Sequence, residues 1–345
     1  MKITKKHLCD LPNCYAVTST VLDGENCYLF ATELNGCCKL ISGQDFSCSN
    51  VWTEPGGTMA MKKLPNMGGD FLAIQHFLPV FQAANSTLVW AHHTKVGTEF
   101  VWNVKTLFTL PYIHRIDILQ RGGVNYLIAT TLCAEKKAPD DWSSPGAVYA
   151  AVLPDDLNHP INLKVVKNGL LQNHGYCHVE QSGYDSALIS TASGVFSLTP
   201  PEHPSGEWEV ETVLDHPVSD IAMCDLDGDG TLELITIEPF HGNRFIVNKK
   251  VENGYENIYE YSKPIEFGHV VWGGKIRGVP TVIGGYRQLE KELFMLQYHD
   301  GKFVETVLDK GQGPSNVAVV NEANRDLILT ANCGVGEAAV YVVED

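Results

Sequence analysis

The sequence predicts an all-β fold, a seven-bladed β-propeller with four antiparallel strands per blade, and three observations lead to it. The first is an internal repeat: the hexapeptide VETVLD at residues 210–215 recurs letter for letter at 304–309, 94 positions later. That offset is twice 47, and a repeat of about 47 residues is in the range of propeller blades. The second is a strand start that recurs along the whole chain, and the third is the way in which the two ends complement each other.

The recurring unit begins with a short turn and an apolar strand. Such strand starts are found at seven places: Ala16, Ala60, Arg115, His178, Asp220, His269 and Asn316. A turn rich in Gly, Asp or Asn then leads to a second apolar strand, as at 233–237, and segments of alternating polarity follow, as at 338–343. Seven repeats of four short strands predict the propeller.

The ends of the chain predict how the ring closes. The last repeat has only three strands before Asp345, and residues 2–8 have the pattern of the missing fourth strand. Pairing this N-terminal strand into the last blade removes the open sheet edges. We therefore expect one domain over residues 1–345; the alternatives are a β-sandwich or two smaller β domains, because regular short strands also occur there.

Composition and charge narrow the function classes. Hydrophobic residues make up 44% of the chain and charged residues 19%, which excludes global disorder. The formal net charge of −16 repels phosphate backbones and anionic lipid surfaces, so we expect neither a nucleic-acid nor a membrane partner. The first ten residues contain no apolar segment, which predicts a cytoplasmic chain. No two of the ten cysteines form a Cys-x-x-Cys pair, and we expect them to be reduced.

One turn carries a dense acidic motif. The segment DLDGDGTLEL at 225–234 places carboxylates at alternate positions on a turn that its glycines permit. Alternate carboxylates of this kind converge on a hard cation, and a later glutamate can complete the oxygen shell. The segment resembles the repeat signature of FG-GAP and VCBS-type propellers. The resemblance implies a calcium or magnesium site at Asp225, Asp227, Asp229 and Glu233; the alternative is a solvated hairpin that binds nothing tightly.

The thirteen histidines divide into two groups when they are placed on the predicted blades. Seven of them fall on loops that reach the upper mouth of the channel: His76, His114, His174, His178, His216, His241 and His269. Convergent neutral imidazoles are good ligands for zinc, manganese or iron. We predict His178 and His269 as the first ligand pair, with His241 as the third nitrogen and Glu238 or Asp220 as an oxygen ligand. The alternative is a channel lining in which the polar groups bond only to one another.

Other side chains of the same face could act on a polar substrate. His114 and Arg115 would supply a base and a fixed cation, and Tyr286 a phenol beside Arg287. His174 is a further catalytic candidate. The long connection at 134–146 is expected to be a lid whose Trp142 offers an apolar surface to a sugar ring.

The predicted blades, the acidic turn and the segments HRID at 114–117 and NHGY at 173–176 resemble the propeller part of the aldos-2-ulose (anhydrofructose) dehydratases. These are metal-dependent lyases that eliminate water from keto-sugars. The resemblance implies a small carbohydrate substrate and β-elimination, in which His114 or His76 removes a proton and Arg115 or Tyr286 assists the leaving group. Two other readings stay open: a non-catalytic propeller that binds a protein or glycan, and a metal-assisted lactone or glycoside hydrolase.

Overall fold

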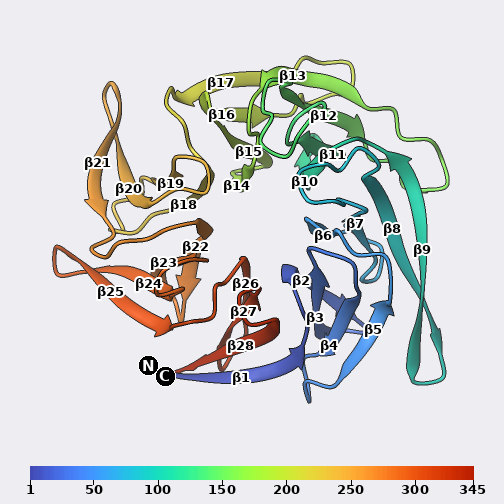
Figure 1. Ribbon diagram of the computed structural model, residues 1–345, viewed down its shortest axis with the longest axis horizontal. Coiled ribbons are helices and arrows are strands. Elements are labelled where there is room, and N and C mark those ends of the chain that lie inside the picture. Colours follow the sequence, from blue (N-terminus) through green and yellow to red (C-terminus); the bar gives the residue numbers. More distant parts are fainter.

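The structure is a computed structural model that describes residues 1–345, and it contains 28 β-strands and no helix. The strands form seven antiparallel sheets of four strands each, arranged as a ring around a central channel (Figure 1). The predicted seven-bladed β-propeller is therefore confirmed.

Blades one to six follow the chain, each strand pairing with the next in sequence. Blades one to three consist of β2 (Cys14–Leu22), β3 (Glu25–Thr32), β4 (Cys38–Ser42), β5 (Cys48–Trp52); β6 (Met61–Lys63), β7 (Phe71–Gln75), β8 (Thr87–Val96), β9 (Glu99–Thr109); and β10 (Ile113–Arg121), β11 (Val124–Thr131), β12 (Gly146–Val152), β13 (Lys164–Leu170). Blades four to six consist of β14 (Gly175–Gln181), β15 (Tyr184–Thr191), β16 (Gly194–Thr199), β17 (Glu209–Leu214); β18 (Asp220–Cys224), β19 (Glu233–Glu238), β20 (Arg244–Val251), β21 (Gly254–Glu260); and β22 (Gly268–Ile276), β23 (Val279–Tyr286), β24 (Leu293–His299), β25 (Lys302–Asp309).

The seventh blade joins the two ends of the chain. It contains β26 (Asn316–Asn321), β27 (Asp326–Asn332), β28 (Glu337–Glu344) and, as its outer strand, β1 (Lys2–Asp10). β1 pairs antiparallel with β28, with Thr4 opposite Val342. The N-terminal strand thus closes the ring as predicted, and Figure 1 shows both termini at the rim of this blade.

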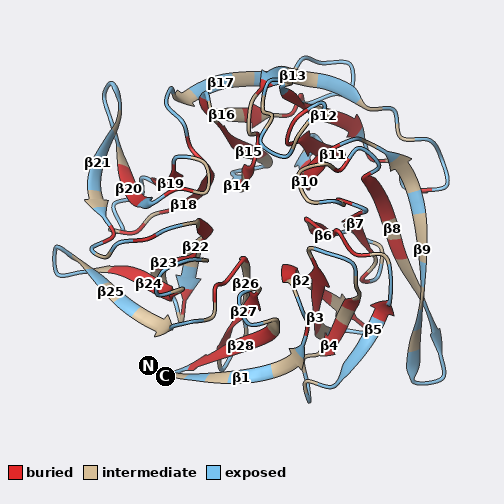
Figure 2. Ribbon diagram, viewed as in Figure 1, coloured by how far each residue is buried: buried red, intermediate tan, exposed pale blue.

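Burial explains the apolar second strands that the sequence displays. Every residue of β7, β19 and β27 is buried, because each of these strands is covered on both faces by neighbouring blades. The outermost strands alternate instead: β25 exposes one face to solvent and turns the other inward. Figure 2 shows the same change from buried inner strands to exposed rim strands around the ring.

The apolar cores lie between blades. Tyr28 and Phe30 of blade one share a cluster with Leu329 and Val340 of blade seven. Such contacts hold neighbouring sheets face to face. Burial of apolar surface stabilises a fold by about 25 cal/mol per Å², and a single sheet without neighbours would leave this surface exposed. The blades therefore position one another, and they fix the channel at the centre.

The observed starts of the first strands lie within two residues of the predicted ones except in blade four, where the difference is three residues. The first strand of blade four begins at Gly175, so that His178 is its fourth residue and lies farther down the channel than expected. His178 therefore does not share the register of His269, which is the second residue of β22. The short β14 can place only the residue before it, His174, at the upper mouth.

Ring closure gives a first testable expectation. Deleting residues 1–10 removes the whole partner of β28 and leaves an unpaired edge. We expect the truncated chain to lose more than about 3 kcal/mol of unfolding free energy and to self-associate. Denaturant melts and light scattering measure both effects, and Lys2→Ala is the control. Unchanged stability of a monomeric truncated chain would contradict the closing role of β1.

Candidate metal centre and its cavity

The upper mouth of the channel is built from one residue per blade. These seven residues stand at or within two positions of the start of the first strands: Tyr15, Met59, His114, His174, Ser219, His269 and Ser315. At Tyr15, His114 and His269 the pairing with the second strand is interrupted by a register shift. A β-bulge re-aims the side chain of its extra residue. The bulges therefore turn these three side chains out of the regular pairing between the first and second strands.

Three imidazoles meet at this mouth. His174 precedes β14, His241 lies in the connection between β19 and β20, and His269 lies in β22, so three consecutive blades each supply one. Their ligating nitrogens lie within 4.8 Å of one another, a spacing that could hold a metal ion. Nε2 of His241 is 3.3 Å from Nε2 of His174. The sequence placed His241 and His269 together; the structure adds His174 as the third member.

Two of these rings are oriented by backbone carbonyls of the next blade. Nδ1 of His174 donates to the carbonyl of Ser219 at 3.2 Å, and Nδ1 of His269 donates to that of Ser315 at 2.5 Å. A carbonyl oxygen only accepts, so the hydrogen of each neutral ring is on Nδ1 and the Nε2 lone pair faces the centre. Histidines that bind metal typically have such an outer partner.

His241 is held differently. Its backbone is in the left-handed region, with φ of 46°, and its N–H donates to Ser219 Oγ at 2.9 Å. Its ring is stacked between Phe240 and Phe267, with centroid distances of 4.1 and 4.3 Å. A residue held in this sparsely populated region is strained, and such strain is common at functional sites.

Burial keeps the imidazoles of this mouth neutral. It lowers the pKa of His114, His174 and His269 well below the ordinary value, and each neighbouring positive group lowers it further. Burial, with Arg287 and Arg115 next in effect, lowers the pKa of His241 to about 3. Metal binding requires neutral imidazole, so no proton has to be displaced near neutral pH.

A cavity of about 170 Å³ opens beside the three rings. Its apolar roof and walls include Phe77, Phe81 and Phe267, and its polar side contains Tyr15, Glu33, His114 and Arg287. The Tyr15 hydroxyl lies 3.4 Å from Nε2 of His269, and burial raises the pKa of this phenol to about 12. His114 is only 2% exposed, and its Nδ1 has no hydrogen-bond partner.

His178 lies in another group of charges. Its Nδ1 is 2.6 Å from Asp117 Oδ2, and Asp117 also binds Lys62. Burial lowers the pKa of His178, but the bond to Asp117 outweighs it and leaves the pKa raised. The structure thus corrects the expected ligand pair: a ring already bonded to a buried carboxylate, three residues into its strand, is not a member of the three-histidine group.

Three predicted catalytic residues do not line the cavity. His76 is exposed, with Nδ1 3.3 Å from Thr87 Oγ1. Arg115 donates from Nε to the carbonyl of His174 at 3.0 Å and lies 3.5 Å from Asp220, so it supports the backbone of a candidate ligand. Tyr286 is fully buried in the core between blades five and six. Its neighbour Arg287 reaches the cavity instead.

The other ionisable candidates bind one another. His216 lies 3.1 Å from Glu238, whose other contacts are Thr236 and Arg244. Asp220, the second suggested oxygen ligand, is 3.9 Å from Nδ1 of His174, on the side of the ring that faces away from Nε2. Neither carboxylate belongs to the three-histidine group.

The segment expected to be a lid packs through Trp142 onto aromatic residues near the cavity. Trp142 packs edge-on against Phe81 and Phe240, with centroid distances of 5.8 and 5.2 Å. The ammonium group of Lys136 lies 3.3 Å from the centroid of the Trp142 ring. Trp142 therefore belongs to an aromatic cover over the histidines, with its outer face occupied by Lys136.

The acidic turn forms a second group that could bind metal. Carboxylate oxygens of Asp225, Asp227 and Asp229 lie within 4.8 Å of one another. Lys249 of the next strand inserts its ammonium group here: it binds Asp227, and it lies 2.7 Å from Asp229 and 3.4 Å from Glu233. These bonds raise the pKa of Lys249. The chain thus supplies its own cation to this turn.

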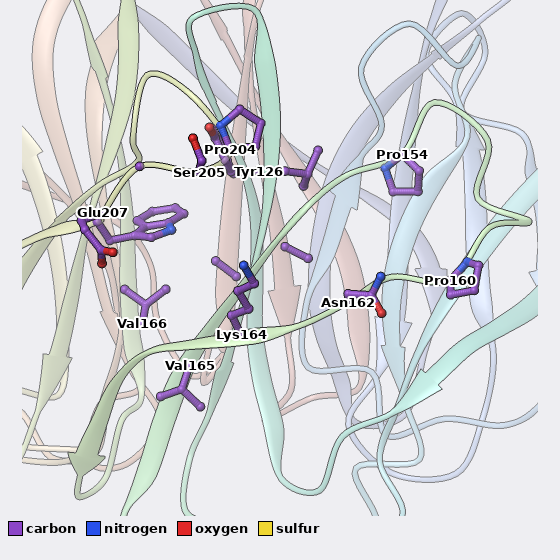
Figure 3. A pocket seen from close by; sticks show the side chains of 15 residues that line it. Tyr126, Pro154, Pro160, Asn162, Lys164, Val165, Val166, Pro204, Ser205 and Glu207 are labelled. Atoms are coloured by element: carbon purple, nitrogen blue, oxygen red, sulfur yellow. The ribbon is translucent and has the colours of Figure 1, made fainter.

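A larger groove of about 460 Å³ lies on the rim between blades three and four (Figure 3). Lys164 and Asn162 line it on one side, and Pro204, Ser205 and Glu207 on the other. No histidine, cysteine or aspartate lines it, so it carries no metal-ligating group beyond Glu207. The three-histidine group lies instead at the smaller axial cavity.

Tyr15 and Glu33 are the ionisable cavity residues that the sequence did not indicate. Both lie in blade one, where no histidine draws attention. A signal for Glu33 exists in retrospect: Glu33, Arg287 and Cys333 each directly follow the second strand of their blades. The bulge at Tyr15 has no recognisable signature in the sequence.

Comparisons with known proteins show the fold. Sqt1 of Saccharomyces cerevisiae matches with a TM-score of 0.55 and 8% identity, over 100% of this chain and 99% of that chain. Two structures of glucose dehydrogenase match with TM-scores of 0.52 and 0.51 and identities of 15% and 16%, each over 99% of both chains. No protein-family model and no curated protein matches the chain. The structure contains no helix of membrane-spanning length and apolarity.

The three-histidine group predicts a metal dependence that metal analysis can check. We expect tag-free protein to bind about one zinc, manganese or iron ion per chain, and each of His174→Ala, His241→Ala and His269→Ala to weaken binding by about 100-fold or more. The matched controls are His178→Ala and His76→Ala, which should retain the ion. Loss of metal in the controls but not in the three variants would reverse the assignment.

Lys249 predicts how the acidic turn responds to calcium. Lys249→Met leaves Asp227, Asp229 and Glu233 without their internal cation, so mutual repulsion should lower Tm by a few degrees in chelator. Millimolar calcium should restore Tm in the variant more than in the parent, as differential scanning fluorimetry would show. An equal calcium response in both chains would show that the ammonium group and the ion do not compete.

Proposed function

We propose that this chain is a metal-dependent carbon–oxygen lyase that acts on a keto-sugar by β-elimination. The observation that carries the proposal is the group of His174, His241 and His269, whose nitrogens lie within 4.8 Å beside a cavity. Three neutral imidazoles leave further coordination positions free for a substrate, as in catalytic rather than structural sites. This donor set suits zinc, manganese or iron.

The residues fit such an ion because their lone pairs are already aimed. Two Nδ1 groups donate to carbonyls, so the lone pairs of His174 and His269 are on Nε2, where His241 Nε2 and the Tyr15 hydroxyl are the protein groups that approach them. A bound divalent ion would act as a Lewis acid that polarises a carbonyl oxygen and acidifies the neighbouring carbon. The protein itself supplies the dry walls, the base and the polar contacts.

The cavity supports a small substrate. A volume of about 170 Å³ corresponds to roughly six water molecules at about 30 Å³ each, which is the size of one sugar ring. The phenyl groups of Phe77, Phe81 and Phe267 offer apolar contact to ring carbons, while Glu33 and Arg287 face the oxygens. A carbohydrate combines both kinds of surface.

His114 is the base in this proposal. Its Nδ1 is buried without a partner, and burial keeps the ring unprotonated. It would take the α-proton; the C–H electron pair becomes the new C=C bond as the β C–O bond breaks with its electron pair on oxygen, and the protonated His114 ring returns its proton to the departing oxygen, so that water leaves. His76, exposed and bonded to Thr87, does not have this position.

The orphaned nitrogen also bears on the non-catalytic alternative. A scaffold would be expected to satisfy the polar groups of its channel with one another, since a buried polar atom without a partner costs about 1–3 kcal/mol. His114 lines the cavity, and its Nδ1 is buried with no hydrogen-bond partner. This favours a site that a ligand completes.

Activity can be tested with a conservative variant. His114→Gln should lower kcat for elimination from D-fructose-type or aldos-2-ulose substrates by about 100-fold or more, since a general base contributes 10²–10⁴-fold. The formation of an enone is followed by its ultraviolet absorbance. The variant should keep its metal ion, and His76→Gln should keep full activity. A metal-loaded parent chain that forms no enone from any keto-sugar would refute the lyase.

A further inference from the structure

A second polar element of the cavity lining is an ion pair. Glu33 follows β3 of blade one and Arg287 follows β23 of blade six, and both line the cavity. Nη2 of Arg287 lies 3.4 Å from Glu33 Oε2, and the two side chains are only 22% and 15% exposed. The ring closure brings these residues together from positions 254 apart in the chain.

The pair is held from behind. Cys333, which follows β27 of blade seven, accepts from Arg287 Nη2 at 3.0 Å and donates its S–H to Glu33 Oε2 at 3.8 Å. Phe267 lies 5.3 Å from the guanidinium carbon, against its ring face. Blades one, six and seven therefore fix the orientation of both charged groups.

Part of this ion pair has no partner in the protein. Arg287 uses only Nη2, so the N–H groups of Nε and Nη1 make no hydrogen bond, and neither does Glu33 Oε1. An edge of donors thus stands beside a free acceptor on a cavity wall. A hydroxyl group both donates and accepts, so neighbouring hydroxyls match this wall.

We infer that the Glu33–Arg287 pair determines specificity in this cavity by binding sugar hydroxyl groups and disfavouring a carboxylate at the same place. The inference rests on the proposed function for the nature of the ligand. A free arginine would bind a carboxylate bidentately. Here the carboxylate of Glu33 already faces Arg287, and a second carboxylate would be placed against it in a poorly solvated site.

The experiment compares two sugars that differ only at C6, D-fructose with a hydroxymethyl group and D-fructuronate with a carboxylate. Binding to zinc-loaded protein is measured by calorimetry in the parent, Glu33→Gln and Arg287→Gln. Glu33→Gln should raise the affinity ratio of D-fructuronate to D-fructose by about ten-fold or more, because the repelling charge is gone. Arg287→Gln should lower the ratio, because Glu33 is left uncompensated.

Glu25→Gln is the matched control: it changes the net charge equally, in the same blade, but at an exposed position. It should leave the ratio unchanged.

If the parent binds both sugars and neither cavity variant moves the ratio, the inference is overturned while the proposed function stands. If the zinc-loaded parent binds neither sugar, both the inference and the keto-sugar substrate fail, whereas zinc content still reports on the metal centre. Glu33→Gln and Arg287→Gln are expected to move the affinity ratio in opposite directions. If one of the two variants does not fold, the other therefore still tests the inference.

Discussion

The packing of seven sheets face to face around one axis is the constraint on which the rest of this structure depends. Each sheet is packed between its neighbours, so the second strands are buried along their whole length and the blades hold one another in place. The start of every first strand is thereby forced to the axis. Residues that are far apart in the chain, such as Tyr15 and His269, meet there at 3.4 Å.

The same constraint explains which parts the sequence could predict. The repeat at 210–215 and 304–309, the buried second strands and the missing fourth strand of the last repeat are periodic features, and periodicity is set by local pairing. The blade count, the order of the strands and the closure by β1 follow from them. The convergence of His241 and His269 also follows, because both lie where a strand reaches the upper mouth.

The remainder of the site depends on single-residue register, which periodicity does not determine. A shift of three residues in the start of β14 moves His178 to Asp117 and brings His174 to the centre. A bulge decides whether Tyr15, His114 and His269 point into the ladder or out of it. Tyr286 and Arg287 show the same sensitivity: successive residues at a strand end face opposite sides, so the tyrosine enters the core and the arginine the cavity.

Burial and function are coupled at the axis through the free energy of desolvation. Placing four imidazoles where burial lowers their pKa, with His241 strained at φ of 46°, does not stabilise the chain by itself. Nε2 of His174, fixed as an acceptor by its Nδ1 bond, lies 3.3 Å from Nε2 of His241, which donates to it in one tautomer and presents a lone pair to a shared ion in the other. Coordination of one ion by all three rings would offset the unfavourable desolvation of the imidazoles with the free energy of metal binding. The apolar cores lie between the blades and hold them in place. The three imidazoles are thereby kept together at the axis before an ion binds.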